Sequence, residues 1–330
     1  MQSLLGDPGV IASLRDLHAE VAVAILDFTP ERAQAVRLLN QQGIPAVAWI
    51  VLPKEEGFYL NADNAAQAAA RMDDFEKWTD ANGLRWAEIG LDVEPNFAQL
   101  AALKGHRWHL FATLLRQSLD GGRIEHAQQA YSSLIREIQS RGYPVETYAM
   151  PYLPAERSVH SSLPDRLLGT VDVRGNDEYL MLYTSFARQV GAAMIWSIGP
   201  HAQSVAIGST DGTSPAGSGT GPLSWEEFSR DLIVASHFSS HIGVYNLEGC
   251  VRQGFLSRLK DLNWSSSVTI PADSASRAER LGLIIRVVLW IASNLVYFIV
   301  IGFLLTAFFV WRRRSTRQRA STAVYQSIQR

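Results

Sequence analysis

Cysteine is almost absent from this chain, since Cys250 is the only one in 330 residues. A single cysteine excludes an intramolecular disulfide and a cysteine metal cluster. A strong net charge is also lacking, because the formal net charge is -2. The main part of the chain has no basic stripe with interleaved aromatic residues, the usual means of neutralising nucleic-acid phosphates. We therefore expect no nucleic-acid partner.

Common catalytic signatures are missing as well. The sequence has no His-Glu-x-x-His pattern for zinc and no Gly-x-Ser-x-Gly turn for a serine nucleophile. The glycine-rich run from Ser209 to Gly221 does not follow the strand–turn–helix order of a nucleotide-binding fingerprint, so we interpret it as a loop. We expect neither a metal nor an organic cofactor.

What the sequence does contain is one long run without charge. Residues 287–311, VVLWIASNLVYFIVIGFLLTAFFVW, carry no charged side chain. A helix of this length, at about 1.5 Å per residue, exceeds the roughly 30 Å hydrocarbon core of a bilayer. Trp311 and the arginines after it are typical of a membrane interface. The run predicts a single transmembrane helix, with the lipid bilayer as a partner.

Arginines set the expected orientation of this helix. Arg277, Arg280 and Arg286 precede the run, whereas five arginines follow it, at positions 312, 313, 314, 317 and 319. The excess on the tail side predicts a cytoplasmic tail and a globular domain outside. The first residues, MQSLLGDPGVIASLRDLH, do not form a signal peptide. Because an exported domain needs one, we interpret Met1 as lying downstream of the true start.

Extended runs rich in valine, isoleucine and tyrosine alternate with amphipathic helices, the order of a parallel sheet with crossover helices. The predicted strands are Val21–Phe28, Ala46–Leu52, Trp86–Val93, Thr147–Pro151, Tyr179–Thr184, Ser204–Ser209 and His241–Asn246. The predicted helices between them include Pro30–Gln42, Ala65–Asn82, Ile124–Arg141, Ser224–His237 and Cys250–Leu262.

Seven strand–helix units are one fewer than the eight of a TIM (β/α)8 barrel. The segment Asp7–Leu17 is predicted as a helix before the strand at Val21, so it is the first barrel helix and the strand before it is lost. We expect an α/β TIM-like barrel lacking its first strand over residues 1–263. A linker (264–286), the transmembrane helix (287–311) and a basic tail (312–330) follow. A doubly wound open sheet is the alternative.

Two acidic residues, Asp92 and Glu94, stand at the end of the third predicted strand, just before Pro95. Residues two apart on a strand point to the same face, and the C-terminal strand ends of a TIM barrel hold its active site. Two carboxyls so close together raise the pKa of one of them, which suits an acid/base pair. The alternative is that one of them only caps the segment beginning at Pro95.

With a lost first strand counted, the Asp-Val-Glu triplet at 92–94 ends the fourth barrel strand, and a Met-Leu-Tyr triplet at 181–183 lies on the sixth. In this the sequence resembles the sugar-cleaving TIM barrels of glycoside hydrolase families 18 and 25. The resemblance to family 18 implies that Glu94 is the general acid. It also implies that Asp92 orients an acetamido group of the substrate, which acts as the nucleophile.

The chain departs from the family-18 pattern at three positions. Thr184 stands where those enzymes carry an acid, and Ala87 and Gly90 stand where they carry aspartates. The resemblance therefore indicates kinship of the barrel more than a particular reaction.

A further acid, Glu248, follows the last predicted strand. In a closed barrel it would approach the cavity of Glu94, and two carboxyls catalyse hydrolysis with retention at about 5 Å and inversion at about 6.5–9.5 Å. A glutamate in the first turn of a helix is also favoured by the macrodipole alone, so both interpretations stay open. Four aromatic residues at strand ends are candidates for a sugar-binding floor: Trp49, Tyr59, Tyr148 and Tyr245.

The leading hypothesis is a membrane-anchored, glycoside hydrolase-like barrel that cleaves an extracytoplasmic polysaccharide, with Glu94 as acid and Asp92 as its partner. Tyr183 and Glu248 are further catalytic candidates. A non-catalytic glycan receptor, favoured by Thr184, and a structural protein are the alternatives, because fold does not fix function. An open cleft where Asp92, Glu94 and Tyr183 converge favours the enzyme. A shallow aromatic groove favours the receptor.

Overall fold

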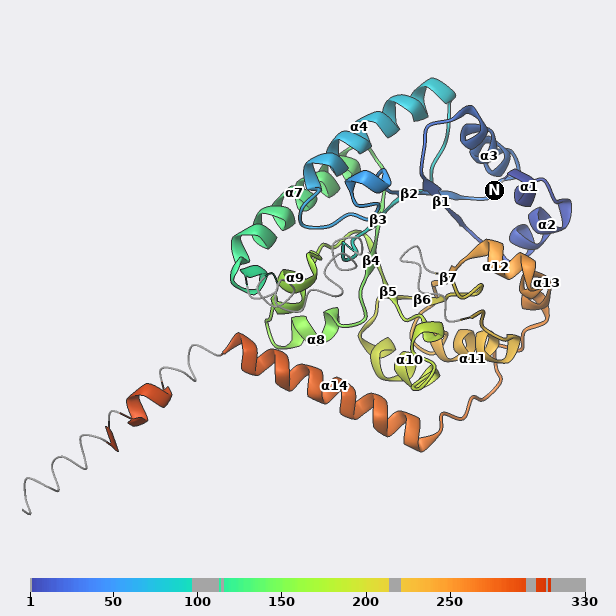
Figure 1. The fold of residues 1–330 in the computed structure, drawn as a ribbon. Coiled ribbons are helices and arrows are strands. Elements are labelled where there is room, and N and C mark those ends of the chain that lie inside the picture. The colour runs from blue at the N-terminus through green and yellow to red at the C-terminus, as the bar shows by residue number, and fades with distance from the viewer. Residues whose placement is uncertain are drawn as a thin grey trace, which may run out of the picture.

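The computed structural model describes residues 2–96, 113, 116–213, 221–294, 301–306 and 308–309. Seven parallel strands pair in chain order, as a TIM-like barrel requires (Figure 1). They are β1 Val21–Ile25, β2 Ala46–Ile50, β3 Glu88–Asp92, β4 Val145–Ala149, β5 Asp177–Met181, β6 Ser204–Gly208 and β7 Ile242–Tyr245. All seven predicted strands are present, most of them shorter than expected.

Helices surround the strands in Figure 1. They are α1 Gln2–Leu5, α2 Pro8–Asp16, α3 Pro30–Gln41, α4 Ala65–Asn82, α7 Gly121–Ser140, α8 Leu153–Ser158, α9 Leu163–Leu168, α10 Ala192–Ile198, α11 Trp225–Ala235, α12 Leu247–Arg252, α13 Phe255–Arg258 and α14 Ala272–Ser293. The continuous helix expected over Cys250–Leu262 is wrong, because Gly254 adopts a left-handed conformation with φ of 69° and separates α12 from α13.

The longer helices begin where the sequence supplies a cap. The Thr29 side chain accepts a hydrogen bond from the Arg32 N–H, and Pro30 follows as the first residue of α3. Ser224 and Glu227 form a reciprocal capping box at the start of α11. These local signals explain why the helix starts could be predicted from the sequence.

Along each strand, successive side chains point alternately to the outer face of the sheet, which the helices cover, and to the inside of the barrel. In β3, Ile89 and Leu91 belong to the hydrophobic core between sheet and helices. Glu88, Gly90 and Asp92 therefore lie on the other face, inside the barrel. Polar residues on an inner face are free to build a site, since the core that stabilises the fold is on the outer face.

The two edges of the sheet are β1 and β7, and no pairing between them is found among the described strands. The helix before β1, α2, packs on α13, and α1 packs on α3. The helix α2, which covers the segment Asp7–Leu17, therefore lies between the first and the last strand–helix units, as Figure 1 shows.

The helix α14 lies along the outside of the barrel, on α8, α9 and α10 (Figure 1). Its less exposed side is a stripe at alternating spacings of three and four residues: Ala275, Ala278, Gly282, Ile285 and Leu289. Leu281 and Ile284 on another side are exposed. The segment expected as a linker, 264–286, thus contains the first part of a packed helix. Small residues in the stripe let the helix approach closely.

No helix in the described part of the chain combines the length and the apolar character needed to cross a membrane. The expected span 287–311 lies partly outside the described residues, and its first part, 287–293, belongs to α14. The basic tail 312–330 lies wholly outside them.

Candidate active site

Asp92 and Glu94 are held in place by the segment around Leu60. The Leu60 N–H donates to the Asp92 carbonyl at 3.0 Å, and the Glu94 N–H donates to the Leu60 carbonyl at 3.0 Å. Leu60 and Val93 form a parallel bridge that extends the sheet beyond β3. The strand alternation therefore continues to Glu94, which places both carboxyls on the inner face at the C-terminal end of the barrel.

Burial makes this pair electrostatically unusual. Asp92 is only 4% exposed, and burial raises its pKa to about 8. The pKa of the half-buried Glu94 is raised well above its usual value by burial and by the neighbouring Asp92. Burial and mutual repulsion therefore favour a proton on the pair, and a protonated carboxyl in a barrel mouth is the form that a general acid requires.

Trp49 is the polar neighbour of Asp92. Its indole N–H lowers the pKa of Asp92, against the larger effect of burial. No hydrogen bond of normal geometry joins the two groups, and neither Trp49 Nε1 nor Asp92 Oδ1, both buried, has a hydrogen-bond partner within the part of the chain that the structure describes. Unpaired buried polar atoms are costly, so these two atoms suit a ligand that brings a donor and an acceptor.

Three tyrosines surround the pair. Burial raises the pKa of Tyr59, Tyr183 and Tyr245, and the charges of Asp92 and Glu94 raise it further in each case. An electrostatic effect of both carboxyls on all three phenols means that the five side chains gather at one place. Tyr183 therefore shares the electrostatic environment of Asp92 and Glu94, and the expected convergence of these three side chains on a ligand stays a prediction.

The aromatic rings at this mouth contact one another. Tyr183 stacks on Tyr245 with ring centroids 5.7 Å apart and an interplanar angle of 24°. Trp49 meets Tyr245 edge-on at 6.3 Å. Since Trp49 is on β2 and Tyr245 on β7, these rings span the barrel interior and form an aromatic wall next to the carboxyls.

Tyr148, expected in the sugar-binding floor, is turned toward the other end of the barrel. Its hydroxyl donates to Glu146 Oε2 at 2.6 Å, two residues back along β4. A side chain at Gly90 would come within 3.0 Å of the Tyr148 ring, so glycine on β3 leaves the space that the ring occupies. Tyr148 therefore fills the barrel beneath Asp92.

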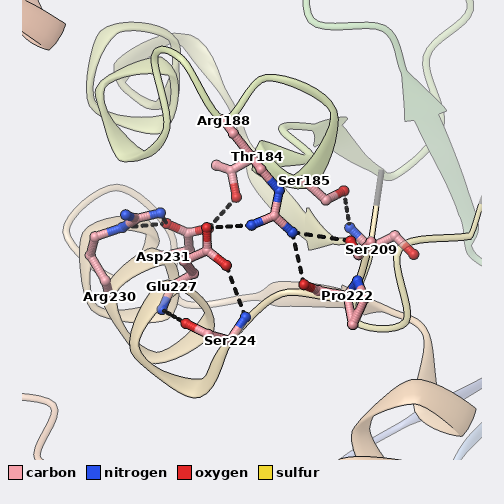
Figure 2. A network of polar contacts seen from close by, with 10 residues as sticks. Thr184, Ser185, Arg188, Ser209, Pro222, Ser224, Glu227, Arg230 and Asp231 are labelled. Carbon is pink, nitrogen blue, oxygen red and sulfur yellow. Dashed lines mark hydrogen bonds and ion pairs between the residues drawn. The ribbon is translucent and has the colours of Figure 1, made fainter. Parts of the chain in front are cut away.

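Thr184, the position where the family pattern has an acid, does not contribute to the mouth. It is 1% exposed and its hydroxyl donates to Asp231 Oδ2 on α11, as Figure 2 shows. Glu248 is exposed in the first turn of α12, and no contact with Asp92 or Glu94 is found for it in the described part of the chain. The structure does not bring Glu248 to the carboxyl pair.

The sequence analysis did not predict Asp211, which lies after β6. Its carboxylate accepts hydrogen bonds from Ser209, Thr213 and Asn246, which lower its pKa to about 2 despite the opposing effect of burial. Its charge is the largest electrostatic contribution to the raised pKa of Tyr245. The run Ser-Thr-Asp-Gly at a strand end was the available signal, but it looked like an ordinary turn.

A second acidic group lies at the opposite end of the barrel. Carboxyl oxygens of Glu20, Glu88 and Glu146 come within 4.8 Å of one another, a spacing that a metal ion would fit. Behind the mouth, a cavity lined by Val93, Tyr152 and other residues has room for about a single water molecule. Neither feature contains the Asp92–Glu94 pair.

Comparison with known proteins gives fold-level similarity. No protein-family model matches the chain, and no curated protein matches it. One similar solved structure is the PgaB (BpsB) glycoside hydrolase domain from Bordetella bronchiseptica, with 12% identity and a TM-score of 0.48 over 80% of this chain and 93% of that one. A family-18 chitinase from Pseudoalteromonas aurantia has 11% identity and a TM-score of 0.44 over 72% and 83%.

A D-allulose 3-epimerase from Methylomonas sp. is similar as well, with 15% identity and a TM-score of 0.39 over 83% of this chain and 89% of that one. Two of these similar structures are glycoside hydrolases, the kind of protein that the sequence resembles, at 12% and 11% identity. The role proposed below for each residue rests on this chain's own geometry.

Proposed function

We propose that this chain is a glycoside hydrolase-like protein that acts on a polysaccharide by acid/base catalysis, with Glu94 as the general acid and Asp92 as its partner. One observation carries the proposal. Two carboxyls with raised pKa values lie on the inner face of one strand end, inside a group of tyrosines. Structural carboxyls in a barrel are usually paired with a cation or a donor, and among the described residues Asp92 Oδ1 has no hydrogen-bond partner.

The chemistry follows from the protonation states. Glu94 donates its proton to the glycosidic oxygen as the bond between that oxygen and the anomeric carbon breaks, which leaves a neutral alcohol as the leaving group. The acetamido oxygen of the same sugar bonds to the anomeric carbon as that bond breaks, and a water molecule then opens the cyclic intermediate and returns a proton to Glu94. The positive charge that develops on the sugar is stabilised by negative charge from the carboxyl pair. Asp92 and Trp49 offer a buried acceptor and a donor, which together suit the amide of an N-acetylhexosamine.

A glycan receptor on the same barrel is the second candidate. Position 184 carries a threonine that is hydrogen-bonded to Asp231, and Glu248 is exposed, so neither position supplies an acid to the mouth. A receptor needs only the aromatic wall and the polar pair formed by Asp92 and Trp49.

Membrane anchoring is part of the same proposal. Its support is the uncharged run 287–311 with arginines on its C-terminal side. We propose that the barrel lies outside the cytoplasm and the tail 312–330 inside it. Protease added to intact cells should then remove the barrel and spare an epitope on the tail. Digestion of the tail epitope from outside would reject this orientation.

A panel of polysaccharides and of N-acetylhexosamine oligomers tests the catalytic proposal. Release of shorter sugars, followed by mass spectrometry, supports the enzyme. Saturable binding without any cleavage, unaffected by Glu94→Gln, supports the receptor instead. The absence of both binding and cleavage across the panel would reject both.

A further inference from the structure

The turn that follows Tyr183 is fastened to two other parts of the barrel by buried side chains. This turn, η2, comprises Thr184, Ser185 and Phe186. Thr184 and Ser185 are each 1% exposed, so their hydroxyls are shielded from water. Figure 2 shows that the two hydroxyls point in different directions, one toward α11 and one toward the end of β6.

On the α11 side, Thr184 donates to Asp231, which is 0% exposed. The other carboxylate oxygen of Asp231 accepts two hydrogen bonds from Arg230, at 2.9 and 2.7 Å. Both carboxylate oxygens of Asp231 therefore accept hydrogen bonds, which fix the orientation of its side chain. Replacement of a buried ion pair by apolar residues of equal volume often leaves a protein as stable or makes it more stable. Stability alone therefore does not account for the charge of Asp231.

On the β6 side, Ser185 Oγ accepts a hydrogen bond from the Ser209 N–H at 2.7 Å. Arg188 extends the connection, because it pairs with Glu227 at 2.6 Å and donates to the Pro222 carbonyl at 2.8 Å (Figure 2). The segment after β5 is therefore bonded to α11 and to the segment after β6. Few backbone rotations remain open to it.

Tyr183 is the residue that these bonds affect in the mouth. It immediately precedes η2, its ring stacks on Tyr245, and its phenol is close enough to Asp92 and Glu94 to be influenced by both. A small rotation of η2 would move the phenol away from the carboxyls. We propose that Thr184 and Asp231 are positioning residues that hold Tyr183 against the carboxyl pair.

The proposal also explains the departure from the family pattern at position 184. In this chain the side chain at 184 is used for anchoring on α11 rather than for contact with a ligand. The catalytic importance of the anchor rests on the proposed function, whereas the position of Tyr183 is measurable without it.

The test places 3-fluorotyrosine at position 183 of the full chain and follows its 19F signal with pH. Burial and the two carboxyls hold the pKa of Tyr183 well above its ordinary value, so the wild-type probe should titrate at a clearly higher pH than 3-fluorotyrosine in an unfolded peptide. Thr184→Val removes the hydrogen bond to Asp231, and the signal should shift and titrate at a lower pH than in the wild type. Thr184→Ser restores the hydroxyl and should restore the wild-type signal.

Asp231→Asn separates the hydrogen bond from the ion pair, because the amide oxygen still accepts from Thr184 while the ion pair with Arg230 is lost. The 19F signal of this variant should stay near that of the wild type. Thr79→Val is the matched control, since Thr79 is also a buried threonine and accepts a hydrogen bond from Trp86 at 3.1 Å, away from the mouth. It should lower thermal stability and leave the 19F signal unchanged.

An unchanged 19F signal in Thr184→Val overturns the positioning role, whatever the activity of the protein. Where the wild type hydrolyses a glycan, Thr184→Val should lower kcat by about 10²-fold with little change in KM, the cost of a displacement of about 1 Å. If the 19F signal shifts in Thr184→Val but the protein neither binds nor cleaves glycans, the positioning role is supported and the proposed function is rejected.

Discussion

The ring of Tyr183 lies stacked on the ring of Tyr245, although Tyr183 follows β5 and Tyr245 ends β7, two strands that are not neighbours in the sheet. The contact therefore bridges over β6. Gly208, at the end of β6, leaves room for the Tyr245 backbone, because a side chain there would come within 2.3 Å of the Tyr245 carbonyl. The stack closes one side of the mouth beside Asp92 and Glu94.

Removal of one stacked ring should weaken glycan binding. Tyr245→Ala removes contacts with both Tyr183 and Trp49, and an aromatic pair is worth about 0.5–1.5 kcal/mol. We expect the Kd for an N-acetylglucosamine hexamer, measured by calorimetry, to rise about tenfold. Tyr143→Ala, which removes a half-buried tyrosine that packs on the core, is the control. An equal rise in both variants would contradict a role of the stack in binding.

Stability should depend on pH through Asp92. Its pKa is about 8 in the fold and about 3.8 when unfolded, so between these values the folded state binds more protons and stability falls as pH rises. Asp92→Asn carries no charge in either state and removes this loss. Its thermal midpoint relative to wild type should therefore increase from pH 5 to pH 8, by the equivalent of about 2–5 kcal/mol.

Other buried acids impose the same trend on both proteins. Burial raises the pKa of Glu146 to about 7 and that of Glu156 to about 8. Both proteins should thus lose stability above pH 5, and the difference between them reports on Asp92 together with its effect on the pKa of Glu94. A difference that does not change with pH would show that Asp92 is ionised in the folded protein.

The indole of Trp49 should tune the acid beside it. Trp49→Phe keeps the aromatic surface and removes the N–H, which among the described groups is the one that lowers the pKa of Asp92. The pKa of Asp92, followed by carboxyl 13C NMR, should therefore rise further. A fall in this pKa would mean that the larger effect of the substitution is to admit water.

Much of this barrel could be predicted from local signals. The strands were predictable because each run contains valine, isoleucine or tyrosine, and α3 and α11 because Thr29 and Ser224 cap them. The short helices α8 and α10 were missed, since six or seven residues are too few to show a helical period. The packing of α14 was missed because its stripe of small residues merges into the apolar run after Val287.

The site was predictable only in part. Spacing alone placed Asp92 and Glu94 on one face, since strand alternation is local. That Tyr148 points to Glu146 and Thr184 to Asp231 depends on tertiary contacts between distant segments. Such contacts leave no mark in a single sequence, and for the same reason Glu248 could not be separated from the mouth before the structure was known.

The general-acid role of Glu94 is the central claim, and the rate of glycan cleavage by Glu94→Gln tests it most directly. The substitution keeps the shape and the hydrogen-bonding reach but removes the transferable proton. Turnover of an N-acetylhexosaminide should fall by about 10²–10⁴-fold while the Kd stays within a few-fold of wild type. Glu248→Gln, a change at an exposed glutamate, should leave turnover unaltered. Equal turnover by wild type and Glu94→Gln would contradict the account.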